Sequence, residues 1–139
     1  MTFSGTWLDG SYDDYECTNF DPDTGLEATY DCSGNTTIRT ADFSGVVDVS
    51  YRFDIGRLEN ELGLGAYHNS GFWFDPEEAY TKINARFSVR DTKTNMKLYG
   101  WGSNLTNEVS HMQRFRQDFG VGESYARPRM WGVGLEWEY

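Results

Sequence analysis

The chain has 139 residues, which is enough for one domain, and its composition gives no sign of a second. Its formal net charge of -10 argues against a nucleic-acid partner, because the phosphates would be repelled. No run approaches the roughly 20 apolar residues of a membrane helix. Aromatic residues nevertheless reach 17% while apolar residues make up only 38%. Alternating barrel strands produce this balance, because only every second residue must be apolar.

The amino-terminal residues lack the basic and apolar regions of a secretory signal peptide. An outer-membrane protein needs such a signal, so a membrane location predicts that the chain is the tail of a longer protein. A first strand is expected near Thr2 to Tyr12, with weak alternation.

The segment from about Asp13 to Asp42 is rich in turn-forming residues and is predicted to be a long loop. It holds two cysteines, Cys17 and Cys32, in similar acidic contexts. A disulfide between them would limit the unfolded state by about 3 kcal/mol in the chain-entropy model. It would also imply an oxidising compartment such as the periplasm or the cell surface. Two free thiols in a mobile loop are the alternative.

The clearest alternation begins at Phe43, where a strand to about Asp54 has an apolar side, and a second side that is polar except for Val46. A slip of one residue would place Asp48 and Arg52 in lipid or core, so the register is strongly specified. A short turn, Gly56 to Asn60, leads into a third strand. That strand runs into an aromatic cluster at 71–74, before an acidic turn at 75–78.

A fourth strand, about Tyr80 to Arg90, sets apolar residues against a side with three cations, which fit a watery lumen facing acidic neighbours. A short turn at 91–95, a fifth strand from Met96 to Leu105, and a second long loop from Thr106 to Pro128 follow. The last strand is apolar and aromatic on one side, with glycine and glutamate on the other. Lipid on one side and a wet lumen on the other would suit this pattern.

Short turns alternate with longer excursions along the chain, as in outer-membrane barrels with short periplasmic turns. The prediction is therefore an all-β fold of about six antiparallel up-and-down strands, being part of a transmembrane β-barrel.

Three motifs occur in order near the end of the chain: Asn84-Ala-Arg-Phe87, Trp101-Gly-Ser-Asn-Leu-Thr-Asn107 and Pro128-Arg-Met-Trp-Gly-Val133. Together with the aromatic end they resemble the C-terminal part of TonB-dependent outer-membrane receptors. That family usually has Lys at the place of Ser103, Asp at that of Asn107 and Phe at that of Tyr139. The resemblance is strong over about residues 80–139, and the hairpin at 43–74 is compatible with it.

The resemblance implies that residues 1–139 are the C-terminal segment of a receptor barrel in the bacterial outer membrane, without the plug domain, the TonB box and the earlier strands. Such a receptor contacts outer-membrane lipid, and it would engage TonB only through the missing N-terminal region. It takes up a scarce small-molecule ligand: an iron–siderophore, cobalamin or an oligosaccharide. Strands in isolation leave two open edges, which hydrocarbon does not tolerate, so this segment alone is not expected to span a membrane or to transport.

The resemblance also implies that the barrel assembly machinery reads the terminal strand as an assembly signal. Its residues are Trp131, Gly132, Val133, Leu135, Trp137 and Tyr139. Ligand contacts are expected from aromatic and polar residues of the two long loops, namely Tyr15, Phe20, Tyr30, Gln113, Arg116 and Tyr125.

No cofactor, metal site or enzymatic activity is predicted. His68 and His111 lack partners at metal-ligand spacing, and no nucleophile–base set is visible. Two alternatives stay open. One is a soluble secreted β-sandwich that binds carbohydrate through Trp7, Trp73 and Trp101. The other is a complete small barrel of about eight strands.

Overall fold

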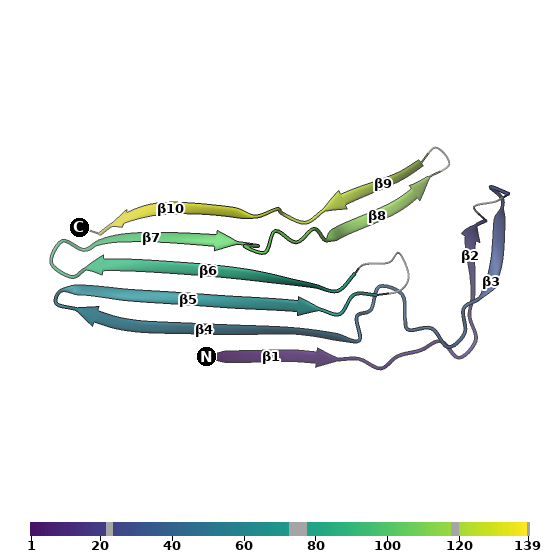
Figure 1. The fold of residues 1–139 in the computed structure, drawn as a ribbon, viewed down its shortest axis with the longest axis horizontal. Helices are drawn as coiled ribbons and strands as arrows, with labels where there is room; N and C mark the ends of the chain where they lie inside the picture. The colour runs from purple at the N-terminus through teal and green to yellow at the C-terminus, as the bar shows by residue number, and fades with distance from the viewer. Residues whose placement is uncertain (22–23, 73–77, 118–119, 139) are drawn as a thin grey trace.

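The computed structural model describes residues 1–21, 24–72, 78–117 and 120–138. Six strands form one antiparallel sheet in the order β1, β4, β5, β6, β7, β10 (Figure 1). Their bounds are β1 Thr2–Trp7, β4 Phe43–Ile55, β5 Leu58–Asn69, β6 Tyr80–Asp91, β7 Met96–Ser103 and β10 Met130–Trp137. The predicted all-β class and the six antiparallel strands are confirmed.

Short turns join β4 to β5 and β6 to β7 at one end of the sheet, where the chain also ends (Figure 1). The first of these turns is tighter than predicted, because β5 already begins at Leu58. Gly56 has a φ of 62°, and a positive φ at the first position is what a two-residue II′ hairpin turn requires. The long excursions leave from the opposite end of the sheet.

Register aligns apolar residues across the sheet in rows. Val49 pairs with Leu64, Leu64 with Ala85, Ala85 with Gly102, and Gly102 with Trp131. Because successive side chains of a strand point to opposite faces, all members of this row lie on one face. That face is apolar from β1 to β10.

The neighbouring row lies on the other face of the sheet. Ser50 pairs with Gly63, Gly63 with Arg86, Arg86 with Trp101, and Trp101 with Gly132. Charged and polar residues dominate this second face, which is called the polar face below. The alternation expected from the sequence therefore persists across five strands.

No layer of the described residues covers the apolar face. Its side chains are largely open to solvent, with exposed fractions of 60% for Leu64, 78% for Trp131 and 72% for Val133. The only buried apolar side chains in the described part of the chain are those of Cys17 and Cys32. Within the described residues, the sheet thus has no hydrophobic core of its own. No helix among the described residues is long and apolar enough to cross a membrane.

The prediction of two unstructured long loops is wrong, because each contains an antiparallel hairpin. Strands β2 (Glu16–Phe20) and β3 (Glu27–Asp31) form the first, and β8 (His111–Gln117) and β9 (Gly120–Tyr125) form the second. Turn-forming composition hid these strands, because their pairing depends on backbone hydrogen bonds rather than on an apolar face. Most of the acidic turn at 75–78, with Trp73 and Phe74, lies outside the described residues.

Candidate functional site

The three sequence motifs come together on adjacent strands β6, β7 and β10. Arg86 of the first motif pairs with Trp101 of the second, and Trp101 pairs with Gly132 of the third. On the apolar face, Ala85 of the first motif pairs with Gly102 of the second. Motifs that are separate in sequence therefore form one continuous patch of the sheet.

Asn104 is the centre of a hydrogen-bond cluster at the long-excursion end of this patch. It is only 3% exposed, and its φ of 51° is one that asparagine tolerates. Its backbone N–H donates to Asn84 Oδ1 at 2.9 Å. Its Nδ2 donates to the carbonyls of Glu108 at 2.9 Å and Arg127 at 3.3 Å, and its Oδ1 accepts from the Glu108 N–H at 3.0 Å. Asn104 thereby joins β6, β7 and the base of the β8–β9 hairpin.

Further residues of the second motif extend this cluster. The Thr106 hydroxyl donates to the Thr81 carbonyl at 2.8 Å, and the Arg129 N–H donates to Asn107 Oδ1 at 3.4 Å. The buried Ser110 hydroxyl accepts a hydrogen bond from Lys82 Nζ. The motif residues outside the strands therefore hold the second hairpin against the sheet.

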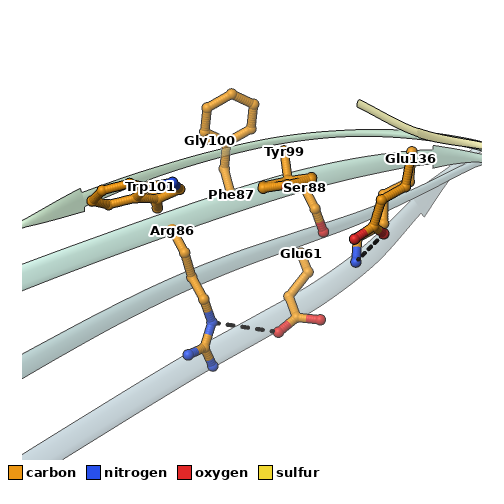
Figure 2. Close-up of a pocket in the computed structure, with 9 residues that line it drawn as sticks. Glu61, Arg86, Phe87, Ser88, Tyr99, Gly100, Trp101 and Glu136 are labelled. Carbon is orange, nitrogen blue, oxygen red and sulfur yellow. Dashed lines mark ion pairs between the residues drawn. The ribbon is translucent and has the colours of Figure 1, made fainter. Parts of the chain in front are cut away.

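The polar face has a shallow pocket of about 410 Å³ on β5, β6, β7 and β10 (Figure 2). Figure 2 shows Arg86 and Glu61 on one side of the ribbon and Phe87 pointing to the other. The lining residues are Glu61, Arg86, Phe87, Ser88, Lys97, Tyr99, Gly100, Trp101 and Glu136. Aromatic rings and paired charges thus share one surface.

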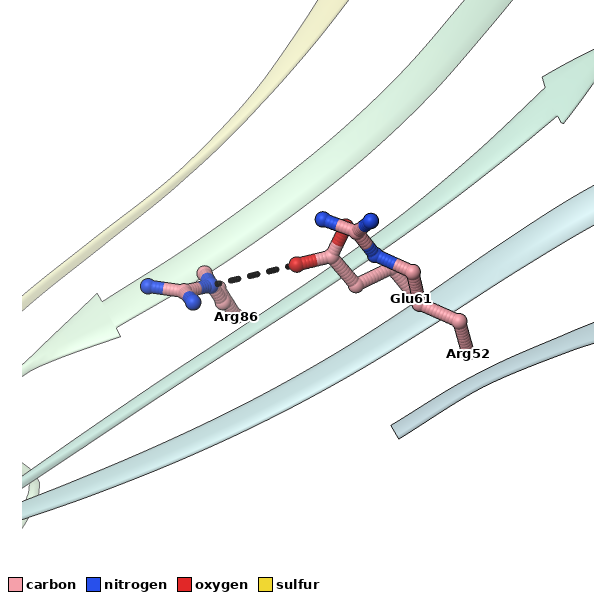
Figure 3. A network of polar contacts seen from close by, with 3 residues as sticks. All are labelled: Arg52, Glu61 and Arg86. Carbon is pink, nitrogen blue, oxygen red and sulfur yellow. Dashed lines mark hydrogen bonds and ion pairs between the residues drawn. The ribbon is translucent and has the colours of Figure 1, made fainter. Parts of the chain in front are cut away.

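Ion pairs connect the strands across this pocket. Glu61 lies 3.0 Å from Arg52 Nε and 3.8 Å from Arg86 Nε (Figure 3). Lys97 Nζ lies 3.4 Å from Glu136. These side chains are partly exposed, so each pair contributes only about 0–1 kcal/mol to stability. The cations around this pocket are therefore paired with carboxylates, although the chain as a whole is acidic.

The other cations of β6 also have partners. Arg90 Nη2 lies 2.7 Å from Glu138 Oε2, and Lys82 bonds to Ser110. Two of the three β6 cations therefore face carboxylates: Arg86 that of Glu61 on the adjacent strand β5, and Arg90 that of Glu138, which follows β10.

Aromatic rings cover glycines on the directly paired strand. Trp101 lies over Gly132, where an ideal Cβ would come within 3.0 Å of the ring, and Tyr99 lies over Gly134 even more closely. On the apolar face Phe87 covers Gly100 in the same way. The glycines that alternate along the last strand are explained by this arrangement, because a larger residue there would displace a ring.

The proposed assembly-signal strand is β10, at one edge of the sheet. Trp131, Val133, Leu135 and Trp137 are all exposed on its apolar side. Gly132 lies on the polar side beneath Trp101. Tyr139 lies outside the described residues.

The proposed ligand residues lie on or beside the two hairpins, Tyr15, Phe20 and Tyr30 at the first and Gln113, Arg116 and Tyr125 at the second. Figure 1 shows both hairpins at the end of the sheet from which the long excursions leave. Tyr30 is exposed on β3 and Tyr15 stacks on Tyr12, with 4.3 Å between ring centroids. Gln113 and Tyr125 are exposed on the second hairpin. The side chains of Phe20 and Arg116 are not among those that the structure describes.

Cys17 and Cys32 form a disulfide across the base of the first hairpin, with their Cα atoms 5.9 Å apart. The Ser33 N–H and hydroxyl both hydrogen-bond the Asp31 carboxylate beside it, which lowers the pKa of Asp31. Ser33 Oγ also accepts from the Tyr15 N–H at 3.1 Å. The bonded pair and this turn together close the hairpin.

The histidines have ordinary neighbours. His68 Nδ1 lies 2.9 Å from the Thr81 hydroxyl, and His111 Nε2 lies 3.6 Å from Glu123. Among the described residues no group of three His, Cys, Asp or Glu side chains is placed to hold a metal ion.

Two tryptophans of the sandwich alternative, Trp7 and Trp101, lie on opposite faces of the sheet. Trp7 pairs with Phe43 on the apolar face, whereas Trp101 lies on the polar face beside Arg86. Trp73 lies outside the described residues.

Comparison with known proteins finds no matching family, no similar curated protein and no similar solved structure.

Proposed function

We propose that residues 1–139 are the C-terminal part of the barrel wall of a TonB-dependent outer-membrane receptor. The receptor would take up a scarce small ligand, and this segment would serve as housing between lipid and a hydrated lumen. Its partners would be outer-membrane lipid and the barrel assembly machinery, with TonB reached only through a region outside this chain.

The observation that carries the proposal is the combination of motif order with two-sidedness. The motifs that carry the resemblance lie on three adjacent strands in direct register. The same strands expose a continuous apolar face and have no covering layer among the described residues. Leaving such a face in water would destabilise a soluble sheet by about 25 cal/mol per Å² of exposed apolar surface. Acyl chains would cover that face without a second protein layer.

The polar face fits the lumen side of such a wall. Its charges are paired across strands, as Arg86 with Glu61 and Lys97 with Glu136, and remain accessible to water. The short turns would then face the periplasm, and both hairpins would lie on the extracellular side. Edge strands β1 and β10 would pair with strands that lie outside this chain, because open edges are not tolerated in hydrocarbon.

Face-specific quenching in detergent micelles tests this proposal. Two variants would each keep one tryptophan, Trp131 on the apolar face or Trp101 on the polar face, with the others changed to Phe. A detergent with brominated tails should quench Trp131 strongly and Trp101 weakly, and aqueous acrylamide should do the opposite. Equal quenching of both residues by the brominated detergent would contradict the proposal.

The soluble β-sandwich remains the competing function and predicts different behaviour. It requires a chain that is folded and monomeric in plain buffer, measured by circular dichroism and sedimentation. The receptor segment should instead require detergent to stay dispersed.

A further inference from the structure

The rings of Tyr99 and Trp101 form a two-ring platform on the polar face, called the aromatic platform below. The residues are two apart on β7, so they share a face and stand about 7 Å apart along the strand. Their cross-strand partners are Gly134 and Gly132. An ideal Cβ on Gly132 would lie 3.0–3.1 Å from three atoms of the Trp101 ring. Each ring therefore fills the empty side-chain space of a glycine and lies along the sheet.

The second face of the Trp101 ring is open, whereas Tyr99 is half-buried and has Lys97 Nζ over its ring, 5.8 Å from the centroid. Trp101 is 42% exposed although it lies against β10, and Figure 2 shows its ring lying along the strand. Aromatic faces carry partial negative charge and attract C–H groups and cations. Both rings line the same 410 Å³ pocket, whose volume falls in the range of small-molecule sites.

The charges around the platform select against ions of either sign. A cationic ligand would meet Arg86 and Lys97, while an anionic ligand would meet Glu61 and Glu136. Both cations already lie within 4 Å of a carboxylate, at 3.8 Å and 3.4 Å. The chain as a whole has a net charge of -10, which further disfavours an anionic metal chelate. A neutral ligand is the one that these charges admit.

The same paired groups suit a ligand that is rich in hydroxyls. Guanidinium and ammonium groups donate hydrogen bonds, carboxylates accept them, and Ser88 does both. A sugar ring has hydroxyls at its rim and C–H groups on its faces. The hydroxyls would hydrogen-bond the charged residues, and a C–H face would stack on the aromatic platform.

We propose that the aromatic platform of Tyr99 and Trp101, bordered by Arg86, Glu61, Lys97 and Glu136, binds a neutral oligosaccharide on the lumen side of the wall. The inference deepens the proposed function, on which its lumen placement rests, by selecting oligosaccharide from the three ligand classes that the resemblance allows. All lining groups come from β5, β6, β7 and β10, so the site does not require residues outside this chain.

The test uses the 139-residue chain in a detergent without a sugar headgroup, such as lauryldimethylamine oxide. The probes are maltohexaose, cellohexaose and xylohexaose, with ferric citrate as the anionic comparison. Calorimetry should detect binding of at least one neutral probe and none of ferric citrate. The fluorescence of a variant that keeps only Trp101 should change with the same concentration dependence.

Trp101→Ala should weaken this binding about tenfold or more, because one stacking contact is lost. Trp131→Ala is the matched control, since Trp131 lies in the next row on the apolar face, and it should leave affinity unchanged. Gly134→Val, which must displace the Tyr99 ring, should also weaken binding and decides the matter if Trp101→Ala does not fold. Circular dichroism checks folding in each case.

Absence of binding by all three neutral probes would overturn the inference, as would unchanged affinity in a folded Trp101→Ala variant. Trp101-dependent binding of ferric citrate would overturn the ligand class. Quenching of Trp131 by brominated detergent is read separately. If Trp131 is quenched and no glycan binds, the inference fails while the proposed function stands.

Discussion

The six-stranded sheet and the two hairpins are stabilised by different means. In the sheet, strands of 12 or 13 residues such as β4, β5 and β6 pair along their length, yet the apolar face lies open. In the hairpins, strands of five to seven residues are closed by a disulfide or by the Asn104 cluster. The sheet therefore depends on its surroundings to bury its apolar face. Each hairpin, by contrast, is closed by covalent or hydrogen bonds at its base.

The largest expected effect comes from a charge on the apolar face. Val49→Arg should destabilise the sheet by about 2–4 kcal/mol if the residue lies near the midplane of a bilayer. Ser50→Arg is the matched control, because Ser50 is exposed on the polar face of the same strand, and its cost should be small. Urea unfolding in lipid vesicles or micelles, followed by tryptophan fluorescence, measures both. Equal costs for the two variants would remove the distinction between faces.

Removing the disulfide should affect only the first hairpin. Replacing Cys17 and Cys32 by Ser releases a constraint worth about 3 kcal/mol in the chain-entropy model. Limited proteolysis should then cut between 13 and 42 much faster, while the quenching of Trp131 in micelles stays the same. A parallel loss of Trp131 quenching would show that the sheet depends on this hairpin.

Substitution of Asn104 should loosen the second hairpin. Asn104→Gly keeps a residue that tolerates positive φ and removes three side-chain hydrogen bonds to Glu108 and Arg127, at an expected cost of about 1–3 kcal/mol. Asn104→Ala adds backbone strain and should cost more. Hydrogen exchange over 111–125 provides the measurement, with 58–69 in β5 as the internal control. Unchanged exchange over 111–125 in both variants would contradict the anchoring role.

The smallest effect concerns pH. Hydrogen bonds from Ser33 lower the pKa of Asp31, so the folded hairpin favours the ionised carboxylate. The resulting stabilisation is present above the unfolded pKa, near about 4, and is lost as pH falls through the lower folded value. A carboxyl-carbon NMR titration should show Asp31 titrating below a typical aspartate, and Ser33→Ala should raise its pKa. No change in that variant would exclude the Ser33 hydroxyl as a cause, because the Ser33 N–H is retained.

Alternation predicted the sheet because every one of its strands must separate an apolar side from a polar side. The register of Phe43–Ile55 and the two-sided last strand could be read from residue order for this reason. The hairpins were not predicted, because their strands need not separate an apolar side from a polar side. Cys17 and Gly122 lie in such strands. A composition rich in Asp, Gly and Ser indicates turns. It does not reveal short strands that are held together by a disulfide or by a local hydrogen-bond cluster.

By itself the sequence determined which side of each sheet strand is apolar, since the two-residue period of a strand is a local property. It also determined that the three motifs lie in order between residues 84 and 133. Only the tertiary structure decided that Arg86, Trp101 and Gly132 share one row and that aromatic rings lie over glycines. Those contacts depend on how strands are aligned with one another, and that alignment is set jointly by the turns and by pairing between residues far apart in the chain.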